Sequence, residues 1–216
     1  MNIKVFSVAL GIALAAMAIS ASAQKAYTEG VVSSNTSMQG NPIEGKKYFR
    51  GDSIAMTYTT GPTIIKVLST AGFSYFAVLV DVPTASIKKA AIATPAEIGA
   101  ILDEWPKFSF AASTETRQIS GFNCKKVVAT DSKTNKAYDV WITNDVPVSP
   151  NIIAPYYAAI GGFPIQYTSF GVDGQSNVVT VTSIADTKAP AGTFGISPDF
   201  EKITMADLKA MSGGGN

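Results

Sequence analysis

Ser86 and Lys89 have the spacing that comes nearest to a known nucleophilic site in this sequence. They match the S-x-x-K pattern of serine acyl-enzymes, in which the lysine lies one helical turn from its serine. Here the pair falls in a segment whose residues alternate as in a strand, and the sequence contains neither an S-D-N nor a K-T-G motif. A hydrolase that uses this pair is therefore the least favoured of three functional hypotheses.

The acidic side chains, which could supply acid–base catalysis or hold a cation, are scattered along the chain. They do not have the spacing of a calcium loop, and no local feature marks any two of them as a glycosidase pair. We predict that they are solvated surface acids and that the protein holds no metal ion and no cofactor. These acids are Asp103, Glu104, Asp139, Asp145, Asp173, Asp199 and Glu201.

Histidine is absent from the sequence, and Cys124 is its only cysteine. These counts exclude zinc sites built from His and Cys clusters, Ser-His and Cys-His catalysis, and an internal disulfide. We expect Cys124 to be a small buried residue in a strand rather than a reactive thiol. The sequence therefore predicts no catalytic residue and favours a protein that is not an enzyme.

The charge balance limits the partners of the protein. The chain has 17 Lys and Arg against 16 Asp and Glu, and only 15% of its residues are charged. A protein that binds nucleic acid or an anionic membrane surface needs a basic excess to displace counterions. We therefore predict no nucleic-acid partner. With 216 residues, 46% of them apolar, the chain is long enough for one domain with a sizeable core.

The first 23 residues have the pattern of a secretory signal peptide. Lys4 supplies a positive start, residues 5–19 form an uncharged run, and residues 21–23 give the small-x-small pattern of a cleavage site. The run is shorter than the roughly 20 residues that cross a membrane. We predict a cleaved signal peptide (1–23), one domain (24–211) and a frayed tail (212–216). The mature protein would be soluble, periplasmic or secreted, and without a transmembrane segment.

Period-two alternation of apolar and polar residues, broken by turn residues, dominates the rest of the chain. Strands follow one another without alternating helices, which predicts an antiparallel sheet. We expect an α+β fold with a curved antiparallel sheet, an open half-barrel of about ten strands. Nine segments are strand candidates: 53–59, 63–69, 73–82, 85–93, 108–118, 122–130, 136–143, 165–170 and 176–184. Among them, 73–82 is a more continuous apolar run, as expected of a strand covered on both faces.

Three segments interrupt the strands with helical signals. Thr94, Pro95 and Glu97 form a capping box with proline at the first helical position, and an apolar stripe that ends at Trp105 follows. The segment 150–160 contains Pro155 and predicts a broken or single-turn helix. The third helix is expected near the C-terminus, at 204–211. We place about three short helices on the concave side of the sheet.

Aromatic and aliphatic residues suggest a ligand cleft between the sheet and these helices. In residues 138–143, alternation puts Trp141 on the face opposite Tyr138, where it is either covered or partly exposed. A curved sheet with amphipathic helices laid across it can enclose an apolar cavity for an acyl chain, and the same residues can instead fill a core. The predicted cleft residues are Ile98, Ile101, Trp105, Trp141, Tyr156, Tyr157 and Phe163.

Four segments resemble those of a group of exported bacterial proteins: ISGFNCKK (119–126), VWITNDVP (140–147), IGGFPI (160–165) and FGISPDFEKITMADL (194–208). Their order is similar to that of motifs in the DUF4412 and GLPGLI families, whose function is unknown. Because 160–165 departs from the hexamer that names GLPGLI, DUF4412 fits better. The resemblance implies an exported bacterial protein with a half-barrel like that of the lipoprotein carriers LolA and LolB. It transfers no site residue, only the position of Cys124.

Three functions compete on these grounds. The favoured one is an exported non-catalytic binding protein that holds an apolar ligand, a lipid or acyl chain, between the sheet and the helices. The alternative is an envelope structural or protein-interaction module with a packed core and no ligand. Such a module would meet an envelope protein partner through a sheet edge or an apolar patch. The hydrolase is the third.

Overall fold

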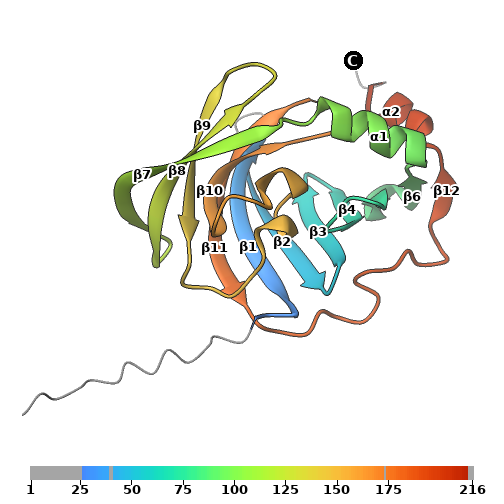
Figure 1. Ribbon diagram of the computed structural model, residues 1–216. Helices are drawn as coiled ribbons and strands as arrows, with labels where there is room; N and C mark the ends of the chain where they lie inside the picture. Colours follow the sequence, from blue (N-terminus) through green and yellow to red (C-terminus); the bar gives the residue numbers. More distant parts are fainter. Residues whose placement is uncertain (1–25, 39–40, 173, 214–216) are drawn as a thin grey trace, which may run out of the picture.

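The computed structural model describes residues 26–38, 41–172 and 174–213. The predicted signal peptide (1–23) and the end of the predicted tail (214–216) lie outside these residues. One open sheet runs through the described chain, and its twelve strands follow the order β12-β6-β5-β4-β3-β2-β1-β11-β10-β9-β8-β7 (Figure 1). Neighbouring strands are antiparallel, except β12 and β6, which run parallel. The expected sheet, rich in antiparallel pairs, is confirmed.

All nine predicted segments contain strands, and three further strands join them. The expectation of about ten strands was therefore too low for the described chain. The strands are β1 (Glu29–Met38), β2 (Asn41–Arg50), β3 (Ser53–Thr60), β4 (Thr63–Thr70), β5 (Phe76–Val82), β6 (Ile87–Ile92), β7 (Phe108–Ile119), β8 (Phe122–Asp131), β9 (Ala137–Thr143), β10 (Phe163–Phe170), β11 (Ser176–Ala185) and β12 (Glu201–Ile203).

The three additional strands, β1, β2 and β12, lack the patterns of apolar residues from which the other strands were predicted. β1 is mostly small and polar, and β2 contains Pro42 and Gly45, which usually mark turns. These two strands form because each pairs with a neighbour along most of its length. β12 has only three residues, and its pairing with β6 joins segments more than 100 residues apart. Long-range pairing of this kind leaves no periodic pattern in the sequence.

Two α-helices and three 3₁₀ turns replace the expected three short helices. α1 (Pro95–Glu104) begins at the predicted capping box, since Thr94 Oγ1 accepts a hydrogen bond from the Glu97 N–H at 3.3 Å. The expected helix at 150–160 is two 3₁₀ turns, η2 (Pro150–Ile152) and η3 (Pro155–Tyr157), because Pro155 cannot donate a backbone hydrogen bond. η1 (Pro83–Ala85) and α2 (Met205–Gly213) complete the set. No helix in the described residues is long and apolar enough to cross a membrane.

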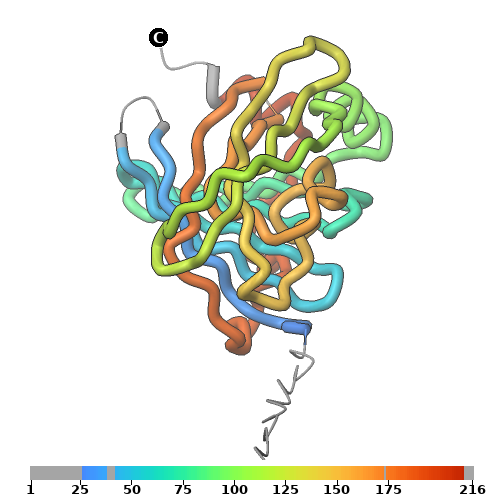
Figure 2. Tube along the Cα trace, turned by 60° about the vertical axis from the view of Figure 1, so that its left-hand side comes forward, coloured from blue at the N-terminus to red at the C-terminus, as the bar shows by residue number. Residues whose placement is uncertain are grey.

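The helices cover one side of the sheet, which we call the inner face. The segment that carries η2 and η3 lies against the sheet in both views (Figures 1 and 2), and its side chains join the core above β8–β11. α1 and α2 lie over β4–β6, where Ile98 and Met205 join a cluster with Phe73 and Phe76. The inner face is therefore covered in two separate places.

The opposite side is the outer face, and its main cover among the described residues lies over β3–β6. The segment 186–200 passes from β11 to β12 and packs three apolar side chains against small residues such as Ala55, Ala77 and Ala90. Lys88 fixes its end through an ion pair with Asp199 at 2.6 Å. The three covering side chains are Phe194, Ile196 and Phe200. Among the described residues, no comparable apolar segment packs on the outer face of β7–β11.

Candidate functional site

Trp105, Tyr156 and Tyr157, three of the predicted cleft residues, meet on the inner face. The ring centres of Trp105 and Tyr156 are 5.2 Å apart, and those of Tyr156 and Tyr157 are 4.9 Å apart. Ile98 and Ile101 of α1 lie in the adjoining cluster, to which Trp105 also belongs. These five predicted residues, which are far apart in the chain, thus lie around one region between the sheet and the helices.

Around η3, this region is filled by the protein's own side chains. Tyr157 is fully buried, its ring is stacked on that of Phe108 at 5.6 Å, and its hydroxyl donates a hydrogen bond to the Thr168 carbonyl at 2.8 Å. Phe163 is also buried, at the start of β10. Burial raises the pKa of Tyr156 to about 12, so this phenol stays neutral. The inner face over β8–β10 is a packed core.

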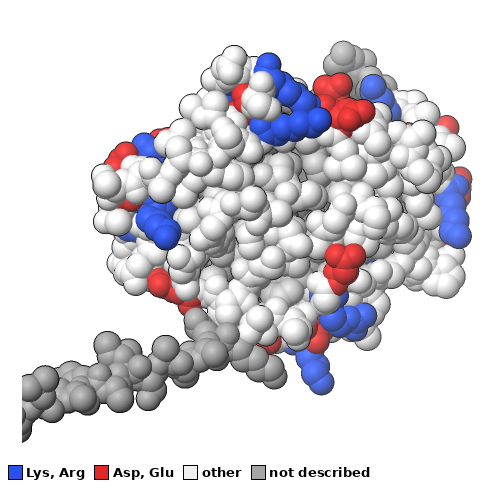
Figure 3. All heavy atoms as spheres, viewed as in Figure 1, with Lys and Arg blue, Asp and Glu red and all other residues white. Residues whose placement is uncertain are grey.

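Two rows of apolar side chains on the inner face of β3, β4 and β5 remain partly exposed. Val67 and Val78 touch the cluster beneath α1. Gly45 of β2 is paired with Tyr58 of β3, the first residue of the second row, and has no side chain that could cover this row. Charged atoms gather mainly around the margin of this side of the molecule (Figure 3). These inner apolar rows, read across the paired strands, are Met56–Val67–Val78 and Tyr58–Ile65–Val80.

Lys47 lies at the end of the first row, directly opposite Met56 in the β2–β3 pair. Its Nζ donates a hydrogen bond to the carbonyl of Ile153 at 2.7 Å and so ties η2–η3 to the sheet. No ion pair joins Lys47 to a carboxylate within the described ranges. Burial among neutral groups disfavours the ammonium and lowers the pKa of Lys47 to about 8.

We expect Lys47 to make stability depend on pH between about 8 and 10. Because its pKa is lower in the folded than in the unfolded chain, the unfolded state binds more protons in this range, and the free energy of unfolding rises with pH. Relative to Lys47→Met, the rise should be about 1–3 kcal/mol. Denaturant unfolding of both proteins at several pH values measures it. Parallel pH profiles for the two proteins would contradict this account of Lys47.

Trp105 carries a buried polar group that has no hydrogen-bond partner among the described residues. Its indole Nε1 is buried, and within the described chain no acceptor lies at hydrogen-bonding distance. A buried donor without an acceptor is costly, so such groups usually meet a water molecule or a ligand. Trp105 packs on the same cluster as Val67 and Val78. The Trp105 side chain therefore packs on the cluster that the first inner apolar row also contacts.

Trp141 lies on the face of β9 opposite Tyr138, as the alternation of residues 138–143 predicted. Tyr138 and Tyr157 both contact Phe108 on the inner face, so Trp141 is separated from Tyr157, with which the predicted cleft had grouped it. It is paired with Lys126 of β8 and Gln166 of β10, and the guanidinium of Arg117 covers its ring. The seven predicted cleft residues thus do not form one site. Arg117 and Gln166 escaped the sequence reading because they meet only through the folded sheet, 49 positions apart in the chain.

The residues considered for catalysis are dispersed. Ser86 ends η1 with a left-handed backbone (φ 54°), and Lys89 lies in strand β6 and pairs with Glu201, so the helical spacing of an S-x-x-K site is not formed. No cluster of acids or cysteine that could hold a metal occurs in the part of the chain that the structure describes. Cys124 is buried in β8, as expected, and burial raises the pKa of its thiol.

Comparison with known proteins identifies no family. No protein-family description matches the chain, and no curated protein matches it in sequence. The chain is similar to PNGF-II in two crystal forms, with TM-scores of 0.45 and 0.47, 16% identity, and 85% of this chain and 32% and 33% of PNGF-II covered. For MucB the TM-score is 0.35, at 7% identity over 80% of this chain and 59% of MucB.

The chain thus spans about a third of the length of PNGF-II and about three fifths of that of MucB. These scores and identities are too low to assign a shared fold or a function.

Proposed function

We propose that this protein is an exported, non-catalytic binding protein that holds an apolar ligand, a lipid or acyl chain, against the inner apolar rows. The observation that carries the proposal is the partial exposure of these six side chains, in register across three strands. Burying a CH₂ group contributes about 0.8 kcal/mol, so an extended chain laid along such rows gains substantial free energy. The signal-peptide pattern supports export, and the resemblance to DUF4412 proteins supports export and a half-barrel like that of LolA and LolB.

The ligand position that we propose differs from the one expected from sequence. Tyr156 and Tyr157 fill the inner face around η3, so the acyl chain would lie beside this core, over β3–β5. Trp105 borders both regions through its contacts with Tyr156 and with the cluster beneath α1. Its indole N–H would donate to a carboxyl or ester oxygen at the head of the ligand.

Replacing Trp105 by phenylalanine tests this contact. The variant keeps an aromatic ring but removes the N–H, so the free protein should be as stable as the wild type or about 1 kcal/mol more stable. Its affinity for the fluorescent fatty acid cis-parinaric acid should fall about three- to tenfold. Thermal unfolding and fluorescence titration measure the two effects.

Trp141→Phe is the matched control, because it makes the same change on the outer face. It should leave the affinity for the fatty acid unchanged. Equal affinities of wild type and Trp105→Phe would exclude the indole N–H as the group that binds the ligand head.

One observation favours a second candidate function, an envelope protein-interaction module with a packed core. The aromatic side chains around η3 are as tightly packed as those of an ordinary core, with Tyr157 and Phe163 buried. If the inner apolar rows contact a protein partner instead of a lipid, the same residues would form part of that interface. The measurement that closes the Discussion separates the two candidates.

A further inference from the structure

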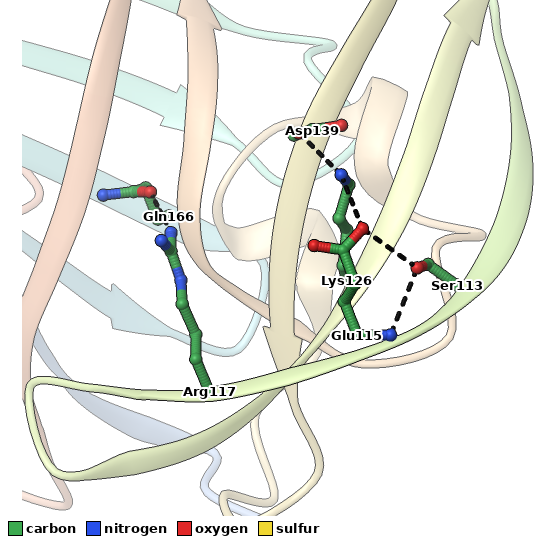
Figure 4. Close-up of polar contacts among 6 residues, drawn as sticks. All are labelled: Ser113, Glu115, Arg117, Lys126, Asp139 and Gln166. Carbon is green, nitrogen blue, oxygen red and sulfur yellow. Dashed lines mark hydrogen bonds and ion pairs between the residues drawn. The ribbon is translucent and has the colours of Figure 1, made fainter.

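The outer face of β7–β11 forms a groove of about 610 Å³ that the apolar ligand proposed above does not use. Its polar side chains come from four neighbouring strands and form two groups, shown in Figure 4. One group is Arg117 of β7 with Gln166 of β10, above Trp141. The other is Lys126 of β8 with Glu115 and Asp139 of β7 and β9.

Arg117 is held in place without a carboxylate partner. Its Cζ atom lies 3.9 Å from the centre of the Trp141 ring, and one N–H donates to Gln166 Oε1. Gln166 is fixed in turn, since its Nε2 donates to Thr180 Oγ1 at 3.0 Å. A guanidinium has five N–H donors, and no other hydrogen bond or ion pair of Arg117 occurs within the described chain. The guanidinium group of Arg117 is therefore oriented and exposed, and its remaining N–H groups can bind an anion.

Trp141 itself offers little surface to a ligand, because Arg117 covers it and only 8% of the residue is exposed. The group that a ligand meets here is therefore the cation and not the indole ring. Stacking also restricts the guanidinium to one orientation, which lowers the entropy lost when an anion binds.

The second group carries an excess of negative charge. Lys126 Nζ lies 2.9 Å from Glu115 Oε1 and 2.9 Å from Asp139 Oδ2, and these hydrogen bonds raise the pKa of Lys126. Glu115 lies where the pairing of β7 with β8 is interrupted by a bulge, and its N–H donates to Ser113 Oγ at 3.2 Å. One ammonium between two carboxylates leaves a net charge of −1. Because both acids bind Lys126, neither neutralises Arg117.

We propose that this groove binds short zwitterionic molecules, of the class of small peptides, with the carboxylate on Arg117 and the ammonium at Glu115 and Asp139. The two groups of the groove carry opposite net charge, and a zwitterion matches both. Val178 of β11 is exposed and lines the groove, so it gives an apolar contact for the body of the ligand. A volume of about 610 Å³ accommodates a peptide of a few residues.

The test is calorimetric titration of the purified protein with trialanine, trialanine amide, N-acetyl-trialanine and inorganic phosphate. We expect saturable binding of trialanine, and a loss of affinity of at least about tenfold when its carboxylate is amidated. Acetylation of its amine should weaken binding by a smaller factor, about threefold, because the acidic group is exposed. Arg117→Gln should reduce the affinity for trialanine at least about tenfold.

Arg50→Gln is the matched control, since Arg50 also lies over an aromatic ring, that of Phe194, but outside the groove. It should bind trialanine like the wild type. The proposal is overturned if trialanine does not bind, if Arg117→Gln binds it as well as the wild type, or if phosphate binds as tightly as trialanine. The last result would identify a site for simple anions.

Discussion

Replacing Tyr157 by alanine is expected to lower the free energy of unfolding by about 3–5 kcal/mol. The side chain is fully buried, is stacked on Phe108 and contacts Tyr167, so its removal leaves a cavity between η3 and the sheet. The hydroxyl also satisfies the Thr168 carbonyl. Equilibrium unfolding in urea, followed by fluorescence, measures the loss as a shift of the midpoint at unchanged m-value.

Tyr157→Phe is the control, because it keeps the ring and removes only the hydrogen bond to Thr168. It should cost about 1–2 kcal/mol. If Tyr157→Ala cost no more than Tyr157→Phe, the ring would not be packed as a core residue. The region around η3 would then be open enough to hold the ligand that we place over β3–β5.

Replacing Ile65 by glutamate is expected to weaken binding of cis-parinaric acid at least about thirtyfold. Ile65 is the centre of the second inner apolar row, between Tyr58 and Val80. The substitution removes an apolar contact of about 1.5–3 kcal/mol and places a carboxylate that must lose water where the acyl chain lies. Fluorescence titration measures the affinity, and circular dichroism shows whether the sheet is retained.

Ile64→Glu is a close control, since it makes the same change at the adjacent residue on the opposite face of β4. Ile64 is 38% exposed, so a carboxylate there stays in water. This variant should bind the fatty acid with wild-type affinity. Equal weakening by both substitutions would indicate a general loss of structure, and no weakening by Ile65→Glu would remove the inner apolar rows from the binding site.

The sequence predicted those parts of the fold that local patterns encode. Alternation located most of the strands from β3 to β11, a continuous apolar run located β5, and the Thr94–Glu97 capping box located the start of α1. β1 escaped because most of its residues are small or polar. It is held by its pairing with β2 and β11 and by Val32, which is buried in the core. The covering of the outer face by Phe194 and Phe200 was equally hidden, because it depends on contacts between distant segments.

The candidate site could be predicted only in part. Trp105, the residue after α1, lies beside Tyr156 of η3, and Trp141 lies on the face of β9 opposite Tyr138. Whether such residues fill a core or leave a surface open depends on neighbours such as Phe108 and Tyr167, which the fold brings to Tyr157. The exposure of Ile65 has a similar cause, because it reflects how far η2–η3 and α1 extend over the sheet.

The most direct test of the proposed function is native mass spectrometry of the protein, produced with its own N-terminal segment and purified from a bacterial periplasm without detergent. We predict a reproducible added mass that organic solvent extracts as lipid or fatty acid, and that is absent from Ile65→Glu. An apoprotein mass that stays unchanged after incubation with phospholipid vesicles would contradict the account. The inner apolar rows would then be assigned to a protein partner.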